Sequence, residues 1–324
     1  MSAQPAPTVP RFDQLPLLAG GEERHAWEVF GPGDELGCLN FIGPDQVRNA
    51  AAEVVSGEVV SLNLPLDLPQ PQFWTRRTPM THHHESRRNI RDDRLDGFQL
   101  QGSTQWDGFR HQRYRQYGFY GGRQDPDLDE GGEIGIDAWA DRGIVTRGVL
   151  VDVAAELERR GDPLVPDVRR GIDHVLIEET LASQQTEVRC GDILLVRTGW
   201  LEWYLGMDEQ ERAARAEQLA ADLPKAELPG LSAGLETVAW LWDHRIAAIA
   251  FDNPTVETLP YRKEDGWAHN RLLPLLGMPL GELWKLDALS AKCAEVARYS
   301  FLLTSAPLNL RGGAGSPANA YAVL

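Results

Sequence analysis

The sequence predicts an α/β fold, a single domain in which helices cover a mixed, partly parallel central sheet. Three continuous apolar runs predict buried strands, at residues 147–153, 192–198 and 246–252. Amphipathic patterns typical of helices lie between them, at residues 172–182 and 235–244. Strands that are apolar on both faces and alternate with helices are typical of a sheet that helices cover on both sides. The chain shows no internal repeat and no low-complexity linker, so one domain over residues 21–324 is expected.

The remaining elements follow in chain order. Residues 1–20 are rich in Pro and Ala and are expected to form a loose, flexible arm. A capped helix is predicted at residues 44–55, and an alternating strand follows at residues 58–64. Residues 65–93 have no clear period, so they are expected to form a long loop of the kind that serves as a lid. A last strand is predicted at residues 299–308.

Composition and charge narrow the class of protein. The net charge of −16 on 324 residues opposes non-specific binding to nucleic acid or to an anionic membrane. The three cysteines have no metal-type spacing, and their odd number argues against a disulfide framework. The N-terminus shows no signal-peptide pattern, and no apolar stretch approaches membrane-spanning length. We therefore expect a cytoplasmic protein whose partner is a small molecule.

The chemically richest stretch is residues 101–111, QGSTQWDGFRH. Gln105 and Asp107 are two positions apart, so in an extended segment their side chains point to one face. Converging oxygen donors with a nearby imidazole can hold a divalent metal and shuttle a proton. The alternative is a polar edge strand with a buried, satisfied aspartate. The chain contains no G-x-S-x-G elbow, phosphate loop or dinucleotide fingerprint, which argues against serine hydrolase and nucleotide chemistry.

This stretch resembles the motif H-x-G-T-H-x-D-x-P-x-H of the cyclase-like metal hydrolases, the group that includes bacterial kynurenine formamidase and isatin hydrolase. Further segments resemble that family in the same order along the chain: residues 30–40, 191–200, 268–273, 280–283 and 315–320. The resemblance implies the family's swivelling β/β/α fold and a homodimer or homotetramer.

Two of the three histidine positions depart from the family motif, and its Pro position is Phe109. Its first two histidines fall at Gln101 and Gln105, and its aspartate and third histidine fall at Asp107 and His111. A glutamine oxygen is a weaker zinc donor than imidazole, so the change either weakens one metal site or tunes it for a harder ion. This glutamine version resembles the branch that contains zinc-dependent trans-dienelactone hydrolase.

The resemblance implies roles for individual residues. Asp107, His269 and Glu282 are expected to bind metal, with Asp107 bridging if two ions bind. Gln101 and Gln105 are weaker candidates for the same ligand set. His111 is expected to be the general acid/base, with a role as a further metal ligand as the alternative. The ion is expected to be Zn²⁺, one or two per chain, with Mn²⁺ possible.

A substrate-binding role is expected for His82, His83 and His84, which lie among arginines in the predicted loop and could attract a carboxylate. An unspecific solvated loop is the alternative. Trp106 is also expected to contact substrate. Together these features predict a metal-dependent hydrolase that opens a lactone, with trans-dienelactone opened to maleylacetate as the specific expectation. An arylformamidase or cyclic-amide hydrolase is the first alternative, and a non-catalytic binding protein on the same fold is the second.

Overall fold

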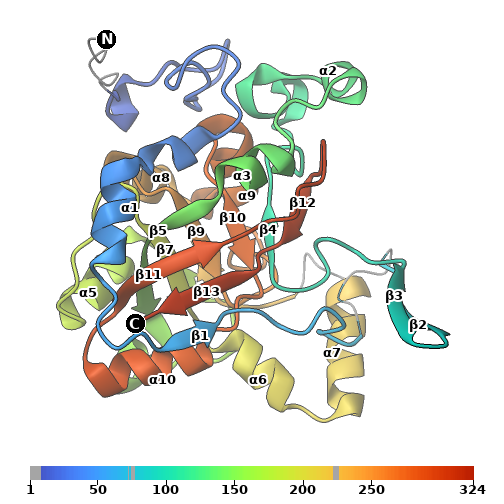
Figure 1. Ribbon diagram of the computed structural model, residues 1–324. Helices are drawn as coiled ribbons and strands as arrows, with labels where there is room; N and C mark the ends of the chain where they lie inside the picture. Colours follow the sequence, from blue (N-terminus) through green and yellow to red (C-terminus); the bar gives the residue numbers. More distant parts are fainter. Residues whose placement is uncertain (1–8, 72, 74–76, 222–225) are drawn as a thin grey trace.

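A nine-stranded mixed sheet forms the centre of the protein (Figure 1). The structure is a computed structural model that describes residues 9–71, 73, 77–221 and 226–324. The strands lie in the order β1 (Val59–Ser61), β13 (Ala320–Val323), β11 (Ser300–Ser305), β5 (Ile144–Asp152), β7 (Ile193–Arg197), β9 (Ala248–Phe251), β10 (Leu280–Glu282), β4 (Gln105–Asp107) and β12 (Gly315–Pro317). The four strands β5, β7, β9 and β10 are parallel, and the other pairs are antiparallel. The predicted α/β class with a mixed, partly parallel sheet is confirmed.

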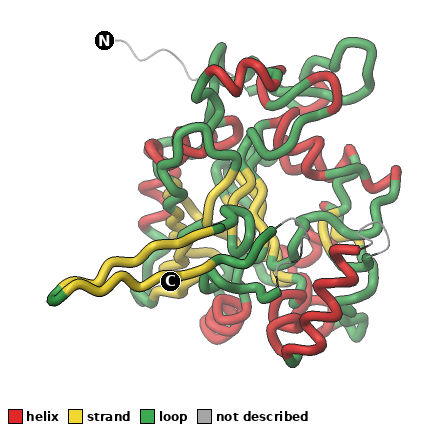
Figure 2. The backbone as a smooth tube through the Cα atoms, turned by 90° about the vertical axis from the view of Figure 1, so that its right-hand side faces the viewer, coloured by secondary structure: helices red, strands yellow, loops and turns green. Residues whose placement is uncertain are grey.

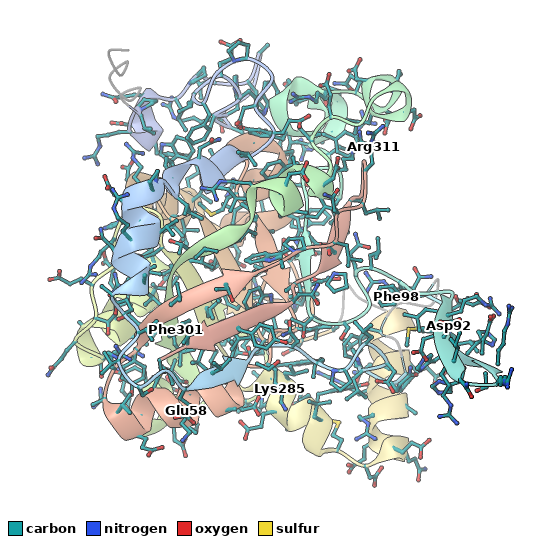
Figure 3. All side chains as sticks on the ribbon, in the orientation of Figure 1. Glu58, Asp92, Phe98, Lys285, Phe301 and Arg311 are labelled. Atoms are coloured by element: carbon teal, nitrogen blue, oxygen red, sulfur yellow. The ribbon has the colours of Figure 1, made fainter. Side chains whose placement is uncertain are left out.

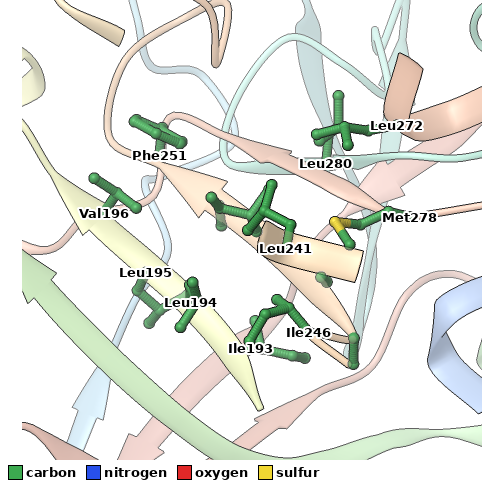
Figure 4. Packing of buried hydrophobic residues seen from close by; sticks show 14 of the residues in the cluster. Ile193, Leu194, Leu195, Val196, Leu241, Ile246, Phe251, Leu272, Met278 and Leu280 are labelled. Carbon is green, nitrogen blue, oxygen red and sulfur yellow. The ribbon is translucent and has the colours of Figure 1, made fainter. Parts of the chain in front are cut away.

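The apolar runs of the sequence form the centre of this sheet. Ile193, Leu194, Leu195 and Val196 of β7 are fully buried, although their side chains alternate between the two faces. Leu241 and Ile246 pack close to them, as Figure 4 shows. The sequence of β7 is continuously apolar because both faces of the strand are covered by other parts of the domain.

Helices surround the sheet (Figure 1). α1 (Pro44–Ala51) packs against β5 and β11, whereas α5 (His174–Ser183) contacts both α4 (Val153–Arg159) and α8 (Leu235–Asp243). The Asp152 and Asp173 carboxylates cap the first turns of α4 and α5 by accepting backbone N–H groups. The other helices are α2 (Asp125–Glu130), α3 (Ile136–Arg142), α6 (Trp200–Gly206), α7 (Glu209–Ala221), α9 (Ala268–Arg271) and α10 (Asp287–Val296). Among the described residues, no helix has the length and apolar character needed to cross a membrane.

The predicted long loop at residues 65–93 is wrong over its second half. A hairpin of β2 (Thr81–Arg87) and β3 (Ile90–Asp96) forms there, and Figure 2 shows it projecting from the body of the domain. Every residue of the two strands is exposed except His83, which is partly exposed. Because neither face of the hairpin is buried, its sequence lacks the apolar alternation by which a strand is predicted.

The segment expected to be a loose arm is packed onto the domain wherever it is described. Phe12, Leu15 and Leu18 are buried, and the Phe12 backbone N–H donates to Asp243 Oδ1 at 2.7 Å. These apolar side chains recur every three residues, so they can reach the core together. Residues 1–8 of the predicted arm lie outside the described residues.

Candidate active site

Strands β4 and β10 bring three polar side chains to one face of the sheet. Glu282 lies directly opposite Gln105 in the antiparallel pair, and Leu280 lies opposite Asp107. Since side chains alternate along a strand, Gln105, Asp107 and Glu282 share a face. The Gln105 Nε2–H group donates to Glu282 Oε2 at 2.6 Å. The predicted convergence of Gln105 and Asp107 is therefore present, with Glu282 added across the strand pair.

His269 of α9 completes this cluster. Its Nε2 atom lies 3.4 Å from Asp107 Oδ2 and 3.4 Å from Glu282 Oε1. Its Nδ1 atom lies 2.7 Å from Glu257 Oε1, which also accepts the His269 backbone N–H at 2.8 Å. The hydrogen-bond network thus assigns a proton to Nδ1, where Glu257 accepts it. Glu257 holds the ring so that Nε2 faces the two carboxylates.

This arrangement fits a divalent metal. Among the described residues, the buried atoms Gln105 Oε1 and Asp107 Oδ1 have no hydrogen-bond partner. The Asp107 and Glu282 side chains are only 1% and 7% exposed. Two carboxylates buried together are costly unless positive charge compensates them. One imidazole nitrogen, two carboxylates and an amide oxygen form a donor set for Zn²⁺ or Mn²⁺, and the Glu257–His269 contact is typical of a metal-binding histidine.

The pKa values of Glu282 and His269 show that negative charge is crowded in the cluster. At Asp107 burial raises the pKa, but His111, His269 and Arg77 outweigh this effect and lower it. Burial and the neighbouring Asp107 carboxylate raise the pKa of Glu282 to about 7. Burial lowers the pKa of His269, but Glu257 and the hydrogen bonds with Asp107, Glu257 and Glu282 outweigh it and raise that pKa well above its ordinary value. Without a bound cation, proton uptake at Glu282 and His269 and the positive charge of Arg77 compensate the carboxylates.

His111 lies at the edge of the cluster, on the turn that follows β4. Its Nδ1 atom is 3.6 Å from Asp107 Oδ1, and its ring centroid is 5.7 Å from that of His269. The Asp107 carboxylate raises the pKa of His111, but burial together with His269 and Arg77 outweighs this effect and lowers it. Its side chain remains 31% exposed, so the ring can exchange protons with molecules in the adjoining cavity.

A cavity of about 340 Å³ opens onto the cluster, a volume near the lower end for small-molecule sites. His111, His269 and Glu282 lie on one part of its wall, with Arg77 beside them. Tyr261 and Trp267 form an aromatic part of the wall, with ring centroids 4.7 Å apart. The cavity wall thus combines the guanidinium of Arg77, an aromatic surface and the acidic cluster.

Two predicted site residues on the same stretch lie elsewhere. Trp106 does not contact the cavity: it is fully buried, packs against Trp284 and donates its indole N–H to Ser305 Oγ at 2.9 Å. Strand alternation turns it to the face opposite Gln105 and Asp107. The Gln101 side-chain amide packs against Gly315, and the Gln101 backbone carbonyl accepts a hydrogen bond from Arg77. The contacts described for Gln101 do not include the acidic cluster.

The three consecutive histidines also lie away from the cavity. His82, His83 and His84 belong to β2 of the projecting hairpin, where they contact Asp93 and Asp96 of β3. Arg77 belongs to the predicted loop at residues 65–93 and lies four residues before β2. Its side chain lines the cavity.

Glu257 is the functional residue that the sequence reasoning missed. It follows the buried parallel strand β9, and ligand sites in such sheets form at the carboxyl ends of strands. The available signal was the alternation of Asn253, Thr255 and Glu257 shortly after an apolar run. The reversal of the chain that carries Glu257 back to His269 includes Val256 at φ 57°, which the local sequence does not indicate.

Comparisons with known proteins agree with the fold and the motifs. The sequence profile of the Cyclase family matches residues 60–258. A crystal structure of a cyclase is 30% identical, covering 93% of this chain and 99% of its own, with a TM-score of 0.80. Isatin hydrolase A from Labrenzia aggregata, bound to benzyl benzoate, is 16% identical over 85% of this chain and 98% of its own, with a TM-score of 0.57. Isatin hydrolase A from Ralstonia solanacearum is 18% identical over 82% of this chain and 91% of its own, with a TM-score of 0.54.

A comparison with curated protein sequences gives no match. The family profile covers β4 and Glu257, and the likeness to the 30% identical cyclase extends over 93% of the chain. The two isatin hydrolases share the fold at lower identity. The protein belongs to the Cyclase family.

Proposed function

We propose that this protein is a metal-dependent hydrolase that opens a lactone ring, with the hydrolysis of trans-dienelactone to maleylacetate as its specific reaction. The observation that carries the proposal is the buried convergence of Asp107, His269 and Glu282 beside a small cavity. Membership of the Cyclase family supports it, and two proteins of the same fold are named isatin hydrolases.

Four side chains would hold the metal: Asp107, Glu282, His269 and, through its amide oxygen, Gln105. We propose Zn²⁺, with Mn²⁺ as the alternative because three of these four donors are oxygens. A divalent ion here supplies Lewis-acid activation of water and of the substrate carbonyl oxygen. Glu257 fixes the orientation of His269 and is a positioning residue.

His111 is proposed to move the proton. Hydrolysis of the lactone adds the hydroxyl of water to the carbonyl carbon and breaks the bond between that carbon and the ring oxygen. The proton released by the water must reach the departing ring oxygen, which becomes the enol of the product. His111 lines the cavity, is partly exposed, and lies beside Asp107, so it can accept the proton from the water and deliver it to the ring oxygen.

The cavity wall supports a planar, negatively charged substrate. Arg77 brings a guanidinium to the wall, and guanidinium groups bind carboxylates strongly. Tyr261 and Trp267 present an aromatic surface on which an unsaturated ring can lie. trans-Dienelactone has both a conjugated ring and a carboxylate, whereas isatin has no carboxylate.

The test measures metal content and substrate preference on one preparation. We expect elemental analysis to find zinc, chelator treatment to abolish hydrolysis reversibly, and trans-dienelactone to be hydrolysed in preference to isatin and to an arylformamide. If isatin or the arylformamide were hydrolysed in preference to the lactone, the protein would be an amidase and not a lactone hydrolase. A metal-free preparation that remains active would overturn the metal-dependent mechanism.

A substitution of Arg77 tests the carboxylate contact. Arg77→Gln is expected to raise KM for trans-dienelactone by about 10-fold or more, because a hydrogen bond to a charged group contributes about 1.5–3 kcal/mol. The KM of Arg77→Gln for the methyl ester of the same lactone should change little, because the ester carries no negative charge. Arg87→Gln, at the exposed end of β2, is the matched control and should leave both KM values unchanged. Equal losses for the acid and its ester would contradict the carboxylate contact.

A further inference from the structure

The β2–β3 hairpin lacks the packing that normally stabilises a pair of strands. Its two seven-residue strands are exposed along both faces, and Figure 3 shows it, with Asp92 labelled, standing apart from the body of the domain. An isolated two-stranded hairpin is at best marginally stable in water. Something other than a hydrophobic core must therefore link β2 to β3.

One face of the hairpin carries a compact set of metal donors. His82 and His84 are two positions apart on β2 and so share a face, and Asp93 of β3 lies directly opposite His84. His82 Nε2 lies 2.8 Å and His84 Nδ1 2.9 Å from the same oxygen, Asp93 Oδ1. The two imidazole rings have centroids 4.2 Å apart, and all three donor atoms lie within 4.8 Å of one another.

We propose that His82, His84 and Asp93 form a second divalent-metal site, which clips the two strands of the hairpin together. Two imidazoles and one carboxylate form a ligand set that suits Zn²⁺ and leaves a fourth position for water. Tetrahedral zinc with bonds of about 2.05 Å holds neighbouring ligand atoms about 3.3 Å apart. The nitrogen and oxygen atoms therefore need to separate by only about half an ångström, which exposed side chains can do by small rotations.

The opposite face of the same hairpin provides a built-in control. His83 Nε2 lies 2.9 Å from Asp96 Oδ2, but Arg94 also pairs with Asp96 and occupies the same carboxylate. That face offers one imidazole beside a guanidinium, which repels a cation. His83→Ala therefore removes a histidine from the same strand without touching the proposed site.

Zinc stoichiometry on the full-length protein tests the site directly. Wild type, the double variant His82→Ala/His84→Ala and His83→Ala are each dialysed against micromolar zinc chloride and analysed for bound zinc. We expect wild type and His83→Ala to hold one zinc ion per chain more than the double variant. Equal zinc in all three proteins would overturn the proposal. The difference in zinc between proteins does not depend on the reaction proposed for the cavity, so the two proposals can fail separately.

Limited digestion with trypsin tests the clip. The hairpin offers cleavage sites after Arg87, Arg88, Arg91 and Arg94. Zinc at ten times its dissociation constant should slow cleavage there by about 10-fold in wild type and His83→Ala, because binding lowers the population of the open hairpin by that factor. The double variant should be cut equally fast with and without zinc. Protection that persists in the double variant, or is missing in wild type, would show that these residues do not clip the strands.

Discussion

Among the described residues, two clusters each bring the polar atoms of two imidazoles and one aspartate within 4.8 Å of one another, and they are built in opposite ways. One is Asp107, His111 and His269, and the other is His82, His84 and Asp93. Asp107 and His269 are 162 positions apart in the sequence, whereas His82 and Asp93 are 11 apart. The Asp107 side chain is 1% exposed, and that of Asp93 is 64% exposed. The first cluster depends on the whole domain, the second on one hairpin.

Burial gives the two clusters different chemistry. The side chain of Asp107 is shielded from bulk water, so the carboxylates interact strongly with any ion and with the groups that orient it. Around Asp93 water can compensate every charge, so the same donors can hold an ion but gain little electrostatic strength from their surroundings. This difference agrees with the proposals of catalysis at the buried cluster and cross-linking of two strands at the exposed one.

Removal of the aspartate from each cluster should give the largest contrast. Asp107→Ala is expected to abolish both metal binding at the active site and hydrolysis, with a loss well beyond the roughly 10- to 100-fold effect of outer-shell residues. Asp93→Ala is the matched control, and its turnover should equal that of wild type. The measurement is kcat together with metal content. Full active-site metal in Asp107→Ala would remove Asp107 from the ligand set.

Removal of a histidine from each cluster separates proton transfer from metal binding. His111→Ala should keep its metal while kcat falls by about 10²–10⁴-fold, the range of general acid–base catalysis. His84→Ala should leave kcat unchanged, since the hairpin lies away from the cavity. Loss of metal in step with activity in His111→Ala would make His111 a ligand instead of the proton carrier.

Glu257 has no counterpart on the hairpin, which makes it a test of preorganisation. Glu257→Gln keeps an oxygen that can accept the His269 Nδ1–H but removes the charge behind the ring. We expect metal affinity to fall by about 10- to 100-fold, with kcat largely restored at saturating metal. Glu257→Ala should lower both the metal affinity and kcat at saturating metal further than Glu257→Gln does. Metal affinity that is unchanged in both variants would contradict the positioning role.

The smallest expected effect is on global stability. Chelation of an ion present at 100 times its dissociation constant should lower the free energy of unfolding by about 2.7 kcal/mol. For a large domain this corresponds to a decrease in Tm of about 5 °C. The same decrease should appear in His82→Ala/His84→Ala, because the hairpin contributes little to global unfolding. It should be missing in Asp107→Ala, and a decrease that persists there would assign the stabilising ion to another site.

Local patterns predicted the fold better than they predicted the site. The buried strands β5, β7 and β9 were each visible as apolar runs, because burial on both faces leaves a signal within a few residues. The β2–β3 hairpin left no such signal because it buries neither face. The three consecutive histidines suggested a substrate-binding lid because they lie among arginines in a segment without a clear period, yet alternation along β2 divides them between two exposed faces.

The sequence by itself determined the α/β class, the family motif and the shared face of Gln105 and Asp107, since these depend on the apolar period and on alternation within a strand. Tertiary structure decided the partners of that face. The pairing of β4 with β10 placed Glu282 opposite Gln105, and the chain reversal after β9 brought Glu257 behind His269. Tertiary packing also buried the opposite face of β4, where Trp106 lies, and directed the hairpin away from the cavity. Contacts between distant segments depend on strand order and register, which a local pattern of residues does not encode.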